Sequence, residues 1–337
     1  MSNEELAGQR IELSTHLTSF AANDPGDWTP MFDRARLLEQ AGFDRLVVSD
    51  HVVFGENIDE YAKPSVGGQP GGRQPTGPDG HWLEPLTTLA VLAGMTSTIR
   101  LGTSILLAAL RRPAVLAKTA ATLDVLSSGR FDLGVGVGWQ REEYLAAGLD
   151  FDNRGRLLDH TLEVCQTLWT QMRAEYDSPE LMFAGIHAMP KPTRPSGVPI
   201  WISGTVNQRV VSRLVRFGVG WIPWGDAAAD IKPALKQMQT RLGDAGGNPD
   251  TLQVTGNLAS VRAADGSLDI DRTLEQVPEL VAAGITDFRV HVSTPADTDA
   301  LGYLRHFVDT FHAVTGRTHE TCRKVAPTRN PPTTTTT

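Results

Sequence analysis

The sequence has few cysteines and no long apolar run. Of its 337 residues, only Cys165 and Cys322 are cysteines. Cys165 falls within a helical pattern and Cys322 lies near the C-terminus, so the pattern does not predict a structural disulfide and is typical of a protein in a reducing cytoplasm. No apolar run approaches the ~20 residues that span a bilayer, and residues 1–10 lack the apolar core of a secretory signal. We therefore expect a cytoplasmic protein that does not enter a membrane.

Blocks of positive charge and metal-binding motifs are also missing. The formal net charge is −8, and no basic block is longer than a dipeptide, which argues against nucleic acid or an acidic membrane surface as a partner. The chain has no H-E-x-x-H, no C-x-x-C and no carboxylate cluster with metal-ligand spacing, so we expect no metal. A G-x-S-x-G elbow, which would favour a hydrolase, is absent too. These absences leave a small organic molecule as the expected partner.

What the chain does contain is a strict alternation of strand-like and helix-like segments. The predicted strands are residues 11–17, 44–50, 99–107, 130–139, 198–204, 220–224, 253–262 and 286–293. Each is followed by a helical pattern, which predicts a parallel sheet covered by helices. Eight such units favour an α/β fold of the closed (β/α)₈ TIM barrel type, and an open doubly wound sheet is the alternative.

The predicted barrel fills residues 11–316, between a disordered N-terminus, 1–10, and a disordered tail, 317–337. Residues 55–81 are rich in Gly and Pro and predict a long loop after the second strand, which we expect to lie over the mouth of the barrel. A Pro-rich insertion over 176–198 follows the fourth βα unit. In this loop-rich chain we interpret His81 and Trp82 as loop residues rather than as parts of a lid.

Polar residues recur where the predicted strands end. In "RLVVSDHVVF" the apolar run leads directly to Asp50 and His51. The other strand ends carry Thr103, Ser104, Trp139, Ser203, Gly204, Thr205 and Trp224. A barrel brings the carboxyl ends of its strands to one rim, where the chemistry of this fold takes place. An isolated Asp-His pair would indicate a cap and a satisfied histidine, but the repetition predicts a site.

Three segments carry a family resemblance: "VSDHVVF", "IRLGTSILLAALRRPAVLAKTAATLDVLSSGRFDLGVGVGW" and "VPIWISGTVNQ" with "GVGWIPW". Over residues 11–315 the chain resembles the bacterial luciferase-like monooxygenases, most closely the branch that uses the deazaflavin coenzyme F420. The resemblance implies an oxidoreductase that transfers hydride between F420 and a small organic substrate. An FMN-dependent monooxygenase that uses reduced flavin and O₂ is the alternative. A non-catalytic barrel that binds flavin or a partner protein is a third hypothesis, and a homodimer is common in the family.

The resemblance also implies roles for the rim residues. It implies a non-proline cis peptide between Ser104 and Ile105 under the middle ring of the coenzyme. It places Asp50 at the polar edge of the ring and His51 near the reacting carbon. His51 is then the catalytic candidate, because imidazole exchanges protons near neutral pH; hydrogen bonding to the coenzyme is its alternative role. Further coenzyme-binding candidates are Thr103, Gly138 and, for the phosphate, Ser203, Gly204 and Thr205.

Two departures from the family pattern bear on the substrate. Sugar-phosphate dehydrogenases of the family have an acidic proton donor where this chain has Trp139, and a lysine for the substrate phosphate where it has Asp226. Both departures predict a less charged, more apolar substrate. We expect the substrate pocket to include His16, Trp139 and Trp224.

Overall fold

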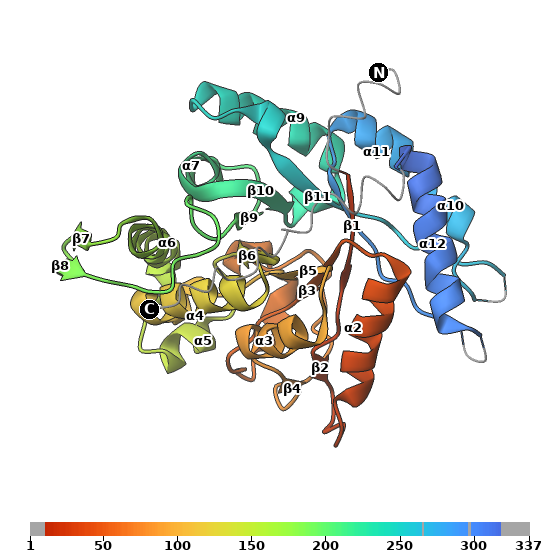
Figure 1. The fold of residues 1–337 in the computed structure, drawn as a ribbon, viewed down its shortest axis with the longest axis horizontal. Helices are drawn as coiled ribbons and strands as arrows, with labels where there is room; N and C mark the ends of the chain where they lie inside the picture. The colour runs from red at the N-terminus through yellow and green to blue at the C-terminus, as the bar shows by residue number, and fades with distance from the viewer. Residues whose placement is uncertain (1–10, 265, 296–297, 318–337) are drawn as a thin grey trace, which may run out of the picture.

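The computed structural model describes residues 11–264, 266–295 and 298–317. Eight parallel strands close into a barrel in the order β1-β12-β11-β10-β9-β6-β5-β3 (Figure 1). The barrel strands are β1 (Glu12–His16), β3 (Arg45–Val48), β5 (Arg100–Thr103), β6 (Phe131–Val135), β9 (Ile200–Gly204), β10 (Gly218–Pro223), β11 (Gln253–Asn257) and β12 (Asp287–Arg289). The predicted barrel is thereby confirmed, and the open sheet is excluded. The termini predicted to be disordered, apart from residue 317, and Cys322 lie outside the described residues.

Helices surround the barrel and cover its outer face (Figure 1). The longer ones are α2 (Thr29–Ala41), α3 (Pro85–Met95), α4 (Pro113–Leu126), α6 (Arg154–Thr170), α7 (Gln208–Phe217), α9 (Ile231–Asp244), α11 (Val277–Ala283) and α12 (Ala300–Thr315). Short helices are α5 (Arg141–Ala146), α8 (Asp226–Ala229) and α10 (Ile270–Leu274). Helix α2 ends where predicted, because Gly42 adopts a left-handed φ of 99° and its N–H bonds back to Glu39.

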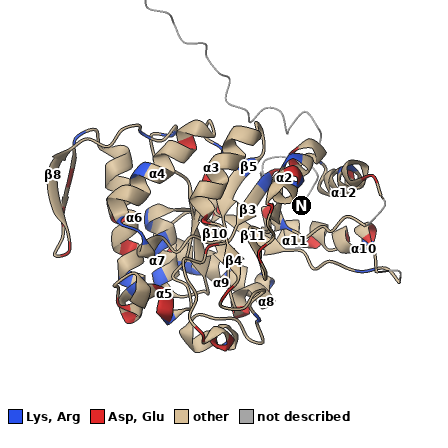
Figure 2. Ribbon diagram, turned by 90° about the horizontal axis from the view of Figure 1, so that it is seen from below, with Lys and Arg blue, Asp and Glu red and all other residues tan. Residues whose placement is uncertain are grey.

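Two predicted segments differ from the structure. The helical pattern over 273–284, which follows the seventh predicted strand, is divided in the structure between α10 and α11, because Pro278 has no N–H for a continuous helix and occupies the first turn of α11. The insertion after the fourth βα unit contains an antiparallel hairpin of β7 (Ala174–Asp177) and β8 (Met182–Ile186), which projects from the barrel (Figure 2). Alternate residues of β8 are exposed although its sequence, MFAGI, is apolar, so the apolar run alone does not show that the strand lies outside the barrel.

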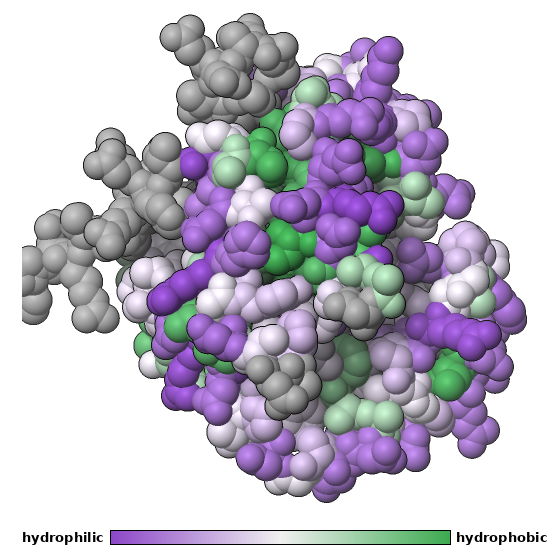
Figure 3. Space-filling model, turned by 90° about the vertical axis from the view of Figure 1, so that its right-hand side faces the viewer, coloured by the Kyte–Doolittle hydropathy of each residue, from purple (hydrophilic) through white to green (hydrophobic). Residues whose placement is uncertain are grey.

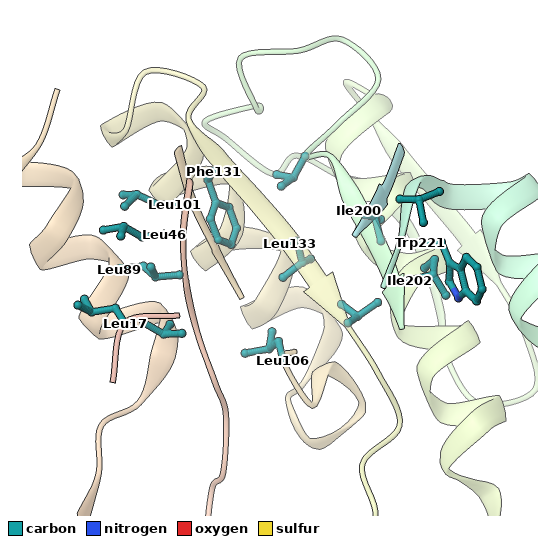
Figure 4. Packing of buried hydrophobic residues seen from close by; sticks show 14 of the residues in the cluster. Leu17, Leu46, Leu89, Leu101, Leu106, Phe131, Leu133, Ile200, Ile202 and Trp221 are labelled. Carbon is teal, nitrogen blue, oxygen red and sulfur yellow. The ribbon is translucent and has the colours of Figure 1, made fainter. Parts of the chain in front are cut away.

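The apolar core lies between the barrel and its helices. Figure 4 shows Leu46, Leu89 and Leu101 close together on one side of this layer, while Ile200 and Ile202 lie on another. All five side chains are almost fully buried. Each full burial of such a side chain contributes roughly 1.5–3 kcal/mol, so this layer is the main source of stability.

The barrel interior below the site is ionic. Arg45 of β3 contacts Glu12, Asp132 at 3.0 Å and Asp287 at 2.9 Å. Arg100 of β5 forms a bidentate pair with Asp132. Burial raises the pKa of Asp132, but the positive charges of Arg100 and Arg45 outweigh this effect and hold the pKa well below its usual range. Because each buried charge has an opposite partner, this network ties five strands, β1, β3, β5, β6 and β12, together under the site.

The surface carries no helix, within the described ranges, that is long and apolar enough to cross a membrane. On the face shown in Figure 3, hydrophilic residues predominate and apolar residues form separate patches between them.

Candidate active site

A cavity of about 870 Å³ opens at the carboxyl ends of the strands. All eight barrel strands contribute to its walls, as expected for the active face of a (β/α)₈ barrel. The contributing residues at the strand ends are His16, Ser49, Asp50, His51, Ser104, Ile105, Gly136, Gly138, Trp139, Ser203, Gly204, Thr205, Ile222, Trp224, Thr255, Asn257, Arg289 and His291. Of the residues predicted from sequence for this site, only Thr103 does not line the cavity.

The long loop after β3 closes one side of this cavity, as predicted. Tyr61, Gly67 and Gln74 of the loop line the same space as Asp50 and Ser203. The indole N–H of Trp224 donates to the carbonyl of Gly67 at 3.0 Å, which ties the loop to the end of β10. A Cβ at Gly67 would lie 3.1 Å from the carbonyl oxygen of Gly138, so glycine permits this close approach.

His51 is held at the cavity wall with one ring nitrogen buried and the other free. Nδ1 is buried and lies 3.4 Å from Oε1 of Glu143, whose side chain has no exposed surface. Nε2 is not among the buried atoms without a partner, and the His51 side chain, which is 10% exposed, lines the cavity. Oε1 of Glu143 also accepts the N–H of Val52 at 2.8 Å, which fixes the chain on the C-terminal side of the histidine. His51 can therefore exchange a proton with a molecule in the cavity through Nε2.

Aromatic rings surround His51 in a continuous series of contacts. Trp82 stacks on Phe20 with centroids 4.2 Å apart and meets the His51 ring edge-on at 4.8 Å. The Phe54 ring packs on His51 with centroids 4.3 Å apart and on Trp82 with centroids 5.6 Å apart. Trp82 belongs to β4 (His81–Trp82), which pairs with β2 (Phe20–Ala21), so the interpretation of Trp82 as loop filler is wrong. The two strands of this small sheet lie far apart in the sequence, which is why residue patterns alone did not reveal the contact.

The series continues past His51 to the end of β10. The ring centroid of Trp139 lies 6.1 Å from that of His51 and 5.4 Å from that of Tyr61. The ring centroids of Tyr61 and Trp224 lie 6.2 Å apart. Trp139 and Trp224 therefore line the cavity as predicted. This part of the wall is suited to an apolar or flat molecule, because aromatic side chains offer large apolar area with few polar groups.

Asp50 lines the cavity, and its carboxylate has partners within the chain. Its carboxylate has no exposed surface and is bound by both terminal nitrogens of Arg111, at 2.6 and 3.0 Å. It also accepts the N–H of Leu107 at 2.8 Å. The second partner of Arg111 is Glu84, at the start of α3, at 2.9 Å. Asp50 thus fixes the segment that follows β5 at the cavity wall.

The end of β5 contains the predicted non-proline cis peptide, between Ser104 and Ile105. The Ser104 hydroxyl accepts a hydrogen bond from Arg289 at 2.7 Å, and this arginine also contacts Asp287 of the ionic network. Thr103, in contrast, is buried, and its hydroxyl donates to the carbonyl of Gly134 at 2.7 Å. Thr103 therefore links β5 to β6 and is not available to a ligand, because strand residues point alternately in and out of the barrel.

A basic region lies where β9 leads into α7, and Figure 2 shows Lys and Arg residues along α6 and α7. Ser203, Gly204 and Thr205 line the cavity there, and Asn207 caps α7 by accepting the N–H of Val210 at 3.0 Å. Gly204 has a φ of 152°, and a Cβ on it would lie 2.7 Å from Val210. This strand-to-helix turn exposes the backbone N–H groups that bind anions at a helix start.

Two arginines that the sequence analysis did not identify belong to this region. Arg209 is exposed, lines the cavity and has no carboxylate partner in the part of the chain that the structure describes. The buried Nε of Arg154 also lacks a partner among the described residues, although its terminal nitrogens bond the carbonyls of Phe151 and Val66. The third arginine, Arg213, is neutralised by Asp159. Two aspartates, Asp152 and Asp226, also line the cavity, and Asp152 pairs with Arg141.

His16 borders the cavity from the end of β1, as predicted. The His16 side chain is exposed to the cavity, but the surrounding barrel withholds solvent from it, and this desolvation and the positive charge of Arg289 lower its pKa to about 3, against an opposing effect of Asp287. His16 is therefore a neutral polar group near pH 7. Grouped metal ligands are absent from the described ranges.

Comparison with known proteins gives a consistent family result. Residues 11–277 match the family model described as luciferase-like monooxygenase. The F420-dependent glucose-6-phosphate dehydrogenase of Segniliparus rotundus is 30% identical over 231 residues, which cover 64% of this chain and 61% of that protein.

Solved structures share the fold at low identity. An F420-dependent secondary alcohol dehydrogenase in complex with an F420-acetone adduct superposes with a TM-score of 0.69 and 16% identity, covering 90% of this chain and 99% of the other. The long-chain alkane monooxygenase LadA has the same TM-score, 0.69, with 15% identity and 92% coverage of each chain.

Proposed function

Since the chain belongs to the luciferase-like monooxygenase family, we propose that it is an F420-dependent oxidoreductase that transfers hydride between this deazaflavin coenzyme and a small, uncharged or apolar organic substrate. The observation that carries the proposal is the free Nε2 of His51 in an otherwise aromatic part of the cavity. The names of a 30% identical relative and of a structural neighbour support F420 as the coenzyme.

The residues present fit a phosphate-bearing coenzyme. Arg209 and the turn at Ser203, Gly204 and Thr205 would hold the phosphate, because an unpaired guanidinium and helix N–H groups both favour an anion. Ile105 and Gly138 border the space that the ring would share with the end of β5. When bound, the deazaflavin supplies a carbon that accepts or gives up hydride.

The chain's own contribution to the reaction is proton exchange and exclusion of water. As an alcohol carbon gives up its hydride, Nε2 of His51 accepts the hydroxyl proton, and in the reverse direction it returns the proton to the carbonyl oxygen. Trp82, Trp139 and Tyr61 exclude water around this nitrogen. Because the walls around His51 are aromatic and Asp226 occurs in the position of a phosphate-binding lysine, we propose an uncharged or apolar substrate.

The second candidate function is an FMN-dependent luciferase-like monooxygenase that uses reduced flavin and O₂. The description of the family and the fold shared with LadA favour it. The phosphate region would serve FMN equally well, so the distinction depends on the ring and on the reaction.

The test is turnover under matched conditions. The protein is incubated with F420 and a panel of alcohols and carbonyl compounds, and separately with reduced FMN, O₂ and apolar hydrocarbons. We expect a change in F420 absorbance with members of the first panel and no oxygenated product in the second. Product formation that requires O₂ and FMN would contradict the proposal.

We also propose a homodimer, which light scattering on the purified protein tests.

A further inference from the structure

We propose that Glu143 is a positioning residue that fixes one tautomer of His51, with the proton on Nδ1 and Nε2 free to accept a proton. The role of this tautomer in turnover rests on the proposed function, but the tautomer itself does not. Glu143 lies on α5, four residues after Trp139, and the sequence analysis assigned it no role.

The first support is the geometry of the pair. Oε1 of Glu143 lies 3.4 Å from Nδ1 of His51, and both side chains are buried at this contact. This separation is slightly longer than a hydrogen bond, and such contacts often shorten when a ligand binds. A carboxylate can only accept, so a proton on Nδ1 places a donor opposite an acceptor, whereas a proton on Nε2 would leave two acceptors facing each other.

The second support is the number of unsatisfied atoms. Within the described residues, Nδ1 of His51 and Oε2 of Glu143 are both buried and have no hydrogen-bond partner. Buried polar atoms without partners are costly, at about 1–3 kcal/mol each. If the imidazole were flipped, a ring C–H would face the carboxylate and the histidine would not satisfy it at all. The observed orientation is therefore the one that the buried acid favours.

The third support is that neither partner has room to move away. Phe54, Trp82 and Trp139 pack around the His51 ring at centroid distances of 4.3, 4.8 and 6.1 Å. Glu143 is held by the N–H of Val52 at 2.8 Å. Glu143 borders the cavity, but its side chain has no exposed surface, so we assign it a role through His51.

The chemical consequence follows from proton balance. When an alcohol is oxidised, its carbon loses hydride to the oxidised deazaflavin and its oxygen loses a proton. The only unprotonated nitrogen of the proposed tautomer, Nε2, takes that proton, and the resulting imidazolium faces the Glu143 carboxylate. In the reverse direction the same nitrogen donates the proton.

The experiment reads the tautomer directly in the full-length, coenzyme-free protein. Long-range ¹H–¹⁵N spectra of histidine-labelled protein distinguish protonated from unprotonated ring nitrogens, at about pH 8, where an ordinary histidine is neutral. The His51→Gln variant assigns the His51 signals by their loss. The variant Glu143→Gln removes the charge at nearly constant shape, and Glu142→Gln is the matched control, because Glu142 bonds Asn57 instead.

We expect wild-type protein and Glu142→Gln to show Nδ1 protonated and Nε2 unprotonated, and Glu143→Gln to show a mixture or the opposite tautomer. With a turned-over substrate, Glu143→Gln should lower kcat by about 10–100-fold with little change in KM, as for other groups that orient a catalytic histidine. A wild-type His51 with its proton on Nε2, or spectra unchanged by Glu143→Gln, would overturn the proposal. The wild-type spectrum decides even if the variant does not fold. If the tautomer is as proposed but F420 supports no turnover, the proposed function fails and the positioning role of Glu143 stands.

Discussion

Replacing Arg209 with glutamine should weaken binding of the coenzyme selectively. Arg209, like Arg154, lacks a carboxylate partner among the described residues, and it is exposed in the first turn of α7, two residues after the cap residue Asn207. A charge-assisted hydrogen bond contributes about 1.5–3 kcal/mol when it is shielded from water. Because the side chain of Arg209 is exposed, we take the lower end, which corresponds to about a tenfold loss of affinity.

The matched control for Arg209 is on the same helix. Arg216 of α7 is paired with Glu163 and does not line the cavity, so Arg216→Gln removes the same charge without reaching the phosphate region. Fluorescence titration with F420 at low and high salt measures both variants. We expect the Arg209→Gln defect to shrink as salt rises, because screening already weakens the wild-type contact. A loss below twofold, or the same loss in both variants, would refute the assigned phosphate site.

Further predictions concern catalysis, stability and pH. His51→Ala and His51→Gln should each lower kcat by ~10²–10⁴ and leave coenzyme affinity within a few fold. The control His81→Gln, at an exposed histidine, should leave kcat unchanged. Near-normal turnover by His51→Gln would make His51 a binding residue. Asp132→Asn should lower the free energy of unfolding, measured in urea, by about 3–5 kcal/mol, because Arg100 loses its buried partner. The control Asp33→Asn, at the exposed pair with Arg36, should change this free energy by less than ~0.5 kcal/mol. Equal effects of the two variants would contradict the ionic network. The unfolded chain protonates His16 near pH 6.5, but the folded chain protonates it only near pH 3, so this histidine lowers stability as the pH decreases between these values. From pH 7 to 5, His16→Gln should therefore lose less stability than the wild type. Parallel losses of stability in the two proteins would count against the lowered pKa.

The barrel and its active rim could be predicted from sequence because their signals are local. Each strand is a short apolar run, and residues such as His51 and Ser203 follow these runs directly. Closure of eight βα units then brings the strand ends together without any knowledge of side-chain contacts. The same locality explains why the loop over 55–81 was placed correctly at the cavity.

The partners of these residues could not be predicted, because they are far away in sequence. Arg111 neutralises Asp50 across 61 positions, and Val52 meets Glu143 across 91. The resemblance assigned Asp50 to the coenzyme, but it could not show that an arginine already occupied the carboxylate. The charged barrel interior was missed for the same reason, since Arg45 and Asp132 each look like an ordinary charge at a strand margin.

The most direct test of the account is a comparison of coenzyme affinities. Purified protein is titrated with F420 and with FMN, both oxidised and reduced, and binding is followed by fluorescence. The account predicts that F420 binds at least tenfold more tightly than FMN, a difference of ~1.4 kcal/mol. Equal or tighter binding of FMN would contradict the deazaflavin assignment and favour the monooxygenase.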